Sequence, residues 1–309
     1  MFDLSRIQFR VARLAVGGLC IAVFMLLAAG CGAARAGRFE AFAAAGTAYT
    51  KARSEFLQQS LETYIDRDSL ELRRQHAATS LSVSDRQALL NSQDQIVRVR
   101  MEIVDDLELH GQVLRQYFTA LSRLSASKED TAAAAAAAKL SGELGKLSAS
   151  LATKSIGGTP IGNVLGRATG FAVGAFRNRA LARHLSESAA TIDRELTLEE
   201  EALRLLAEEM IADQNALKND DRRTKVTVPF RAADALPPDW EHDRRFHLLA
   251  QANIAKAKAA QDAARQLRLT FESLSKGEND QGGVAALHLA IERLSRFVGN
   301  FAASQTPKP

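Results

Sequence analysis

The chain has 309 residues, of which 46% are apolar, with only six prolines and one tryptophan. This composition favours a mostly helical fold over a sheet, and the length allows a substantial buried core. The formal net charge of +4 falls to +2 without residues 1–30, which hold three arginines and one aspartate, and so small an excess argues against a nucleic-acid-binding surface.

Residues 1–30 have the three parts of a secretory signal peptide. The opening MFDLSRIQFRVAR carries three arginines, and the sixteen residues that follow, LAVGGLCIAVFMLLAA, carry no charge. Such a run is short for a bilayer-spanning helix, which needs about 20 residues. The sequence therefore predicts a signal peptide over residues 1–30 and a short tether over 31–38.

Small residues precede a cysteine at the end of this segment, in LAAGC, Leu27 to Cys31. The pattern resembles the lipobox of bacterial lipoproteins, although the usual leucine three places before the cysteine is Ala28 here. The resemblance implies cleavage before Cys31 and attachment of the lipidated Cys31 to a membrane. Because Gly32 rather than aspartate follows, it also implies the outer membrane, facing the periplasm, with the inner membrane as the alternative.

Two amphipathic helices are predicted next. In the first, over about 39–76, aromatic and leucine residues recur every seven or eight positions, at Phe42, Tyr49, Phe56, Tyr64 and Leu72. The second, over about 85–125, follows a capping-box pattern at Ser84 and Gln87 and has an apolar stripe that includes Leu90, Val97 and Val104. Their spacing predicts a coiled-coil-like antiparallel pair.

The rest of the chain adds further helical segments. These are an alanine-rich helix from 132, a charged helix over 177–219, and helices over 239–276 and 284–301, with an irregular loop at 219–238 and a disordered tail at 304–309. A strand-like piece at 226–230 contains Pro229, which argues against a central strand. The predicted fold is all-α: an elongated antiparallel bundle of five to six helices, forming a single domain over 39–303.

A glycine occurs at every fourth position of GTPIGNVLGRATGFAVG, at Gly158, Gly162, Gly166, Gly170 and Gly174. Thr159 and Pro160 suit the start of a helix, so the pattern predicts a helix over 158–184 with one bare face. Each interior glycine costs about 0.8–1 kcal/mol relative to alanine, which close approach of another helix would offset. The segment resembles the glycine zippers of some membrane-associated proteins and outer-membrane lipoproteins.

Two interpretations of this helix remain open. In the favoured one it is the central helix of the bundle, and its bare face contacts a neighbouring helix, a second copy of the chain or another envelope protein. In the alternative, the segment inserts into a bilayer, as in pore-forming helical proteins, with His184 and nearby arginines at the headgroups. Arg167 argues against insertion because a central arginine costs about 2.5–3.5 kcal/mol in a membrane.

Few residues suggest chemistry. Glu102, Asp106 and His110 are spaced i, i+4, i+8 and are weak candidates for a metal site, but a solvated polar face is the favoured interpretation. The mature chain has no Glu-x-x-His pair of the di-iron bundles and no Gly-x-Ser-x-Gly elbow, and the sulfur of Cys31 would carry the lipid. We therefore expect no metal, no cofactor and no catalysis.

The sequence thus predicts a lipid-anchored, periplasm-facing helical protein with a structural, scaffolding or binding role at the cell envelope. Its partners are the membrane, through Cys31, and a copy of itself or an envelope protein, through the glycine face. A membrane-active helical protein is the alternative, and a metal-binding or enzymatic bundle is the weaker one.

Overall fold

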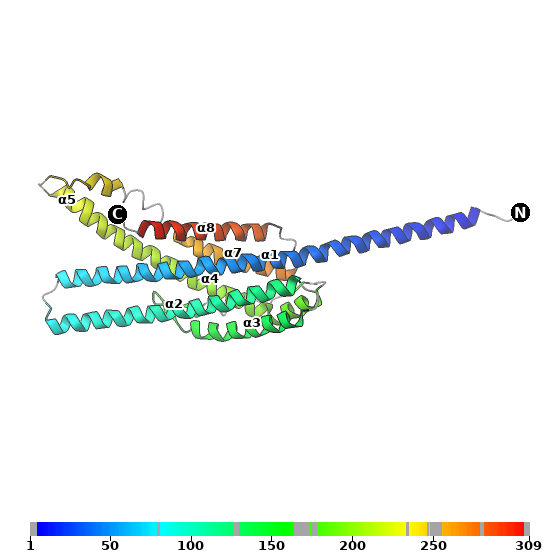
Figure 1. Cartoon of the computed structure of the whole chain (residues 1–309), viewed down its shortest axis with the longest axis horizontal. Helices are drawn as coiled ribbons and strands as arrows, with labels where there is room; N and C mark the ends of the chain where they lie inside the picture. Colours follow the sequence, from blue (N-terminus) through cyan, green and yellow to red (C-terminus); the bar gives the residue numbers. More distant parts are fainter. Residues whose placement is uncertain are drawn as a thin grey trace.

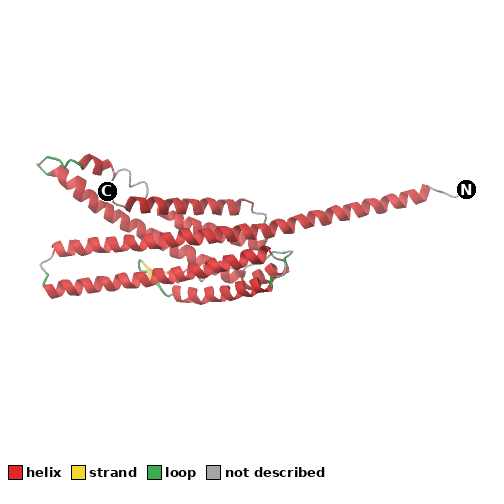
Figure 2. Ribbon diagram, viewed as in Figure 1, coloured by secondary structure: helices red, strands yellow, loops and turns green. Residues whose placement is uncertain are grey.

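The computed structural model describes the backbone of residues 5–78, 81–126, 130–163, 173–174, 178–232, 235–245, 247, 255–278 and 281–305. Side chains are described from residue 37 to residue 300 of these ranges, apart from residues 78, 255 and 281. The all-α prediction is confirmed, since Figure 2 shows helices almost throughout the described ranges and a single very short pair of strands.

The long helices lie side by side in an elongated bundle (Figure 1), and they are α1 (Ser5–Ala78), α2 (Val83–Ala126), α3 (Thr131–Leu151), α4 (Arg179–Arg222), α7 (Ala259–Lys276) and α8 (Gln281–Gln305). The short elements are β1 (Ser155–Ile156), β2 (Thr159–Pro160), the π-helical turn η2 (Arg223–Thr227), α5 (Val228–Arg231) and the 3-10 turn η3 (Ala255–Lys258). Short connections make α1 and α2, and then α2 and α3, antiparallel neighbours.

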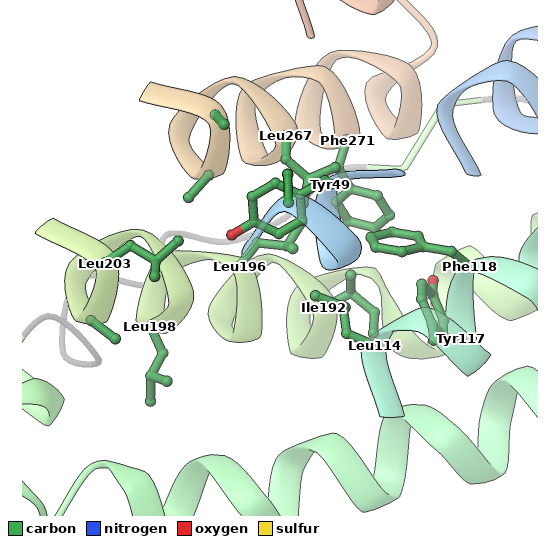
Figure 3. Close-up of a cluster of buried hydrophobic side chains, with 14 of the residues drawn as sticks. Tyr49, Leu114, Tyr117, Phe118, Ile192, Leu196, Leu198, Leu203, Leu267 and Phe271 are labelled. Carbon is green, nitrogen blue, oxygen red and sulfur yellow. The ribbon is translucent and has the colours of Figure 1, made fainter. Parts of the chain in front are cut away.

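Helix α1 is the central helix of the bundle. It contacts α2, α4, α7 and α8, and the predicted aromatic positions Phe42, Tyr49 and Phe56 are fully buried. The rings of Phe42 and Phe118 meet edge to face with centroids 5.6 Å apart. Gly46 makes this contact close, because a Cβ there would lie 2.6 Å from the Phe118 ring. Figure 3 shows Tyr49, Phe118 and Phe271, from three helices, in one cluster.

Helix α2 confirms the predicted second helix, although only its second half is part of the core. From Arg100 onward the predicted stripe is buried, as at Val104 and Leu107, whereas Leu90 is 43% exposed and Ile96 is 46% exposed. Figure 1 shows the first half of α2 beside the end of α1, in a hairpin that projects past α3. With one neighbouring helix instead of several, these apolar side chains stay partly in solvent.

Two predictions about the starts of the first two helices are wrong. The tether at 31–38 belongs to the backbone of α1, because CGAARAGR has strong helix formers and no proline to interrupt them. The N-terminal end of α2 is capped by Ser82 rather than Ser84, since the Asp85 N–H donates to Ser82 Oγ at 3.2 Å. Both serines precede the same run of helix formers, so the local pattern alone does not distinguish the two cap positions.

Among the described residues of the glycine-zipper helix predicted over 158–184, only 179–184 are α-helical, as the start of α4, so the prediction is wrong for the described glycines. Gly157 and Gly158 have φ values of +57° and +78°, and they turn β1 back onto β2, which contains Thr159 and Pro160. Two adjacent residues with positive φ are typical of a tight hairpin turn, and Gly-Gly suits it well. The hairpin turn therefore forms, although Thr159 and Pro160 also suit the start of a helix. Gly166 and Gly170 lie outside the described residues.

Helix α4 begins at Arg179 instead. Asn178 caps it by accepting a hydrogen bond from the Leu181 N–H at 3.1 Å, and the Asn178 side-chain amide donates to the Leu124 carbonyl at 2.9 Å. Close backbone approach does occur at two glycines of the row. A Cβ on Gly162 would lie 2.6 Å from the Ala152 carbonyl oxygen, and one on Gly174 would lie 2.4 Å from the Lys276 carbonyl oxygen.

The irregular loop predicted at 219–238 is largely helical. Helix α4 continues to Arg222 and leads through η2 into α5. Pro229 lies in the first turn of α5, where a backbone N–H would have no hydrogen-bond partner within that helix, so its absence costs nothing. The strand-like interpretation of 226–230 is therefore wrong. Of the helix predicted over 239–276, the structure describes helical backbone at 240–245 and 247, and then η3 and α7 from residue 255. The predicted C-terminal helix is confirmed as α8.

Candidate functional site

The structure separates the predicted metal-ligand set. Glu102 is exposed, Asp106 is half-buried with its carboxylate 3.7 Å from Lys154 Nζ, and only His110 points into the core. Positions spaced by four drift around a helix by 40° per step, so one face is not shared over three of them. Within the described ranges, no group of three or more His, Cys, Asp or Glu side chains is arranged to hold a metal ion.

His110 belongs to a different set of ionisable side chains, which we call the buried ionic cluster. It joins three helices, and all its members are fully excluded from solvent. The members are Tyr49 and Arg53 of α1, His110 of α2, and Glu195 and Glu199 of α4. Because unpaired buried charges are very costly, every contact within this cluster matters to the fold.

Arg53 and Glu199 form the centre of the buried ionic cluster. The Arg53 guanidinium donates two hydrogen bonds to the Glu199 carboxylate, from Nε to Oε1 and from Nη2 to Oε2. The Nη2–Oε2 distance is 3.1 Å. Tyr49 donates its hydroxyl proton to Glu199 Oε1 at 2.9 Å, and Arg53 Nη2 also donates to the Leu107 carbonyl at 2.7 Å. Two-point contacts of this kind are geometrically specific, so they set the register of α1 against α4.

His110 lies between the two carboxylates of the cluster. Its Nε2 is 3.4 Å from Glu195 Oε2, and its Nδ1 is 3.4 Å from Glu199 Oε2. Ser148 of α3 donates to Glu195 Oε1 at 2.9 Å, which brings a fourth helix into contact with the cluster. With His110 protonated, two cations face two carboxylates.

The electrostatics agree with this arrangement. Burial alone lowers the pKa of His110, but the contacts with Glu195 and Glu199 outweigh it and raise the pKa overall. Burial raises the pKa of Glu199, but the charge of Arg53 and the contact with His110 outweigh it and lower the pKa to about 2. The pKa of Tyr49 is raised by burial and by the Glu199 charge. Arg53 and Glu199 are therefore charged at neutral pH, and Tyr49 is a neutral donor.

Gly111 makes room for the cluster. A Cβ at this position would lie 2.4 Å from Arg53 Nη1, so the guanidinium can approach α2 this closely only because residue 111 has no side chain. The sequence contains a weak signal for the cluster. Tyr49 and Arg53, like Glu195 and Glu199, are i, i+4 pairs among apolar positions that face the core.

A second buried polar contact joins α2 to α4. His184 Nε2 lies 3.2 Å from the Tyr117 hydroxyl, and the Ser188 hydroxyl donates to the His184 carbonyl at 2.5 Å. Burial lowers the pKa of His184 to about 4, so the ring is neutral at pH 7. In this structure His184 therefore lies in the core.

These buried groups fit a structural role better than a catalytic one. Catalysis needs reacting groups that a substrate can reach, yet Arg53, His110, Glu195 and Glu199 are 0% exposed. Buried ion pairs add little net stability compared with apolar packing, but removal of one partner is strongly destabilising, and they can specify which helices pair. The cluster therefore links α1, α2 and α4 through buried polar contacts.

The remaining predicted site residue, Cys31, lies on the backbone of α1, and its side chain is outside the described residues. Among the residues that the structure describes, no helix is both long enough and apolar enough to cross a membrane. No protein-family model, curated protein or solved structure was found to match the chain.

Proposed function

We propose that this protein is a lipid-anchored helical protein of the cell envelope, held at a membrane through Cys31 and facing the periplasm, with a scaffolding or binding role. Three features of the first 31 residues support the anchor: an arginine-bearing start, sixteen uncharged residues, and small residues before Cys31. Gly32 after the cysteine favours the outer membrane over the inner one.

The observation that carries the proposal is the continuity of α1. Cys31 and the first core residue, Phe39, which is 1% exposed, are on one uninterrupted helix. At 1.5 Å per residue, the eight intervening steps span about 12 Å. A lipid on Cys31 would therefore hold the bundle close to the membrane through a stiff connection. Such a geometry suits a protein that presents its far end to partners.

The interior of the bundle supports a role without catalysis. Each ionisable residue of the buried ionic cluster contacts another member of the cluster and is excluded from solvent. The membrane-active alternative has weaker support. The described backbone at Gly162 and at Gly174 is not α-helical, so any continuous helix between these glycines is far shorter than the roughly 20 residues that a bilayer requires.

The experiment that tests the anchor is metabolic labelling with palmitate of cells that produce the full chain. Wild-type protein should carry the label and lose residues 1–30, as seen in the mass of its N-terminal peptide. The Cys31→Ser variant should carry no label and keep residues 1–30.

The chain has one other cysteine, Cys20, which provides the matched control. Cys20→Ser should be labelled and processed like the wild type. Retention of label in Cys31→Ser, or its absence from the wild type, would overturn the proposal. Density-gradient separation of the two membranes then tests the outer-membrane assignment.

A further inference from the structure

A groove lies between the end of α1 and the start of α2, which we call the hairpin-tip groove. Its volume is about 500 Å³, within the range of sites that bind ligands. Apolar side chains form much of its lining, among them Leu72 of α1 and Leu89 and Leu90 of α2. Val83 stands at its edge and is 84% exposed. An apolar lining this open to solvent indicates a surface that a partner covers.

The charged side chains that line the groove are Arg73 of α1 and Arg86 of α2, and no carboxylate lines it. His76 of α1 lines it as well. None of the three forms an ion pair or a side-chain hydrogen bond with any residue that the structure describes. By contrast, Arg74 next along the chain reaches Asp220 at 2.9 Å. The groove thus offers unpaired positive charge above an apolar lining, which complements an acidic, apolar partner.

The helices around the groove indicate the shape of that partner. Residues 83–99 of α2 include no buried side chain, although Val83 and Leu90 are seven positions apart and share a helix face. In the body of the bundle, by contrast, α1 is covered by four helices. Helix α4 reaches the end of α1 at Arg74, but the heptad-spaced apolar side chains of α2 at Val83 and Leu90 stay exposed and lack a covering helix that would complete their packing. An amphipathic helix fits this groove better than a compact small molecule does.

We propose that the hairpin-tip groove binds an acidic amphipathic helix of a partner protein. The longer segments after α1 that lie outside the described residues do not have the required charge. Residues 164–172 (VLGRATGFA), 248–254 (LLAQANI) and 306–309 (TPKP) contain no aspartate or glutamate. The other such segments after α1 are too short to form a helix. The occupant therefore comes from another molecule.

The position of the groove argues against the anchoring membrane as the occupant, and this step rests on the function proposed above. His76 is 45 positions after Cys31 along the same helix, which corresponds to roughly 70 Å at 1.5 Å per residue. With α1 directed away from the membrane, a groove at this distance from the lipid attachment point lies beyond the reach of that membrane. The partner is then a protein of the periplasm or of the opposite membrane.

The test uses the purified full chain in phosphatidylcholine nanodiscs and two labelled helical peptides of about 18 residues, or five turns. Both have leucines at heptad a and d positions, with glutamates at e and g in one and lysines in the other. Fluorescence anisotropy should show binding of the acidic peptide only. The double variant Arg73→Glu/Arg86→Glu should weaken that binding at least about tenfold and bind the basic peptide instead.

A matched pair of variants tests the apolar lining. Leu90 and Ile96 are similarly exposed on the same helix, at 43% and 46%, but only Leu90 lines the groove. Leu90→Asp should weaken binding of the acidic peptide, and Ile96→Asp should leave it unchanged, with unfolding temperatures like the wild type in both. The tip is at the surface, so neither substitution disturbs the core.

Four outcomes would overturn the proposal. They are no binding of the acidic peptide, equal loss in Leu90→Asp and Ile96→Asp, competition by phosphatidylglycerol vesicles but not by unlabelled acidic peptide, and a dimer in which the groove is already covered. Lipid labelling of Cys31 is measured separately in cells, so failure of the anchor and failure of the groove are distinguishable.

Discussion

Arg53 of α1 and Glu199 of α4 form an ion pair at the centre of the bundle, with both side chains 0% exposed. They are 146 positions apart in the sequence, and Tyr49 and His110 complete the environment of the carboxylate. A pair of this kind closes a long loop of chain, so it contributes to which helices become neighbours as much as to how firmly they are held.

Removal of one partner from this pair should strongly lower the stability of the fold. Glu199→Gln leaves the Arg53 charge buried without its counter-ion, and we expect the free energy of unfolding to fall by about 3–5 kcal/mol. Urea denaturation followed by circular dichroism measures the change. Glu208 on the same helix forms an exposed pair with Arg204, so Glu208→Gln should cost no more than about 1 kcal/mol. Equal losses in the two variants would contradict the assigned role of the buried ionic cluster.

His110 should make stability depend on pH in the neutral-to-basic range. Its pKa in the folded state is raised, because the two carboxylates outweigh burial, so the folded state binds the proton more tightly than the unfolded chain. The contribution is complete below the unfolded pKa of about 6.5 and is lost as pH rises through the higher folded pKa. Denaturation midpoints from about pH 6 to about pH 9 should therefore decline in the wild type and decline less in His110→Gln. A steeper decline in the variant would contradict the assignment.

His184 should have the opposite effect at lower pH. Burial lowers its pKa to about 4, so the unfolded chain binds more protons than the folded chain between about pH 4 and pH 6.5. Stability should fall as pH drops through this window. His184→Gln, which keeps a neutral polar group beside Tyr117, should reduce that dependence relative to the wild type. An unchanged slope would mean that the His184 ring reaches solvent.

Two glycine substitutions should have opposite signs. Gly174→Ala would place a Cβ 2.4 Å from the backbone carbonyl of Lys276, and the resulting shift should cost about 1–3 kcal/mol. Gly142 lies within α3, and a Cβ added there would have no neighbouring atom within 4 Å, so Gly142→Ala should gain about 0.5–1 kcal/mol through helix propensity. Thermal unfolding of the two variants measures both effects. A loss in Gly142→Ala would contradict the open surroundings of that residue.

Elements with a strong period can be predicted from the sequence. The seven-residue spacing of Phe42, Tyr49 and Phe56 predicts the buried face of α1, and the stripe around Val104 and Leu107 predicts α2. Both depend on a local rule, because apolar residues at helical spacing form one face whatever they pack against.

The predictions fail where two local sequence patterns compete, or where contacts between distant residues determine the structure. Thr159-Pro160 has the chemistry of a helix start, yet the preceding Gly157-Gly158 has the chemistry of a hairpin turn, and the turn forms. The buried ionic cluster could not be predicted because Arg53, His110 and Glu199 come from three helices, and their meeting depends on packing register. The spacing of His110 from residues 102 and 106 is likewise local information, and it does not show which side chains of other helices His110 meets.

Because α1 is continuous, it fixes the direction in which position 31 points around the helix axis relative to the bundle. Because position 31 and the buried face that begins at Phe39 are on one helix, deletion of a single residue between them would turn position 31 by about 100° around the axis relative to the bundle. Deletion of a full turn would nearly restore its direction and only shorten the reach. The direction in which position 31 points relative to the bundle is thus set by the number of residues in that short stretch.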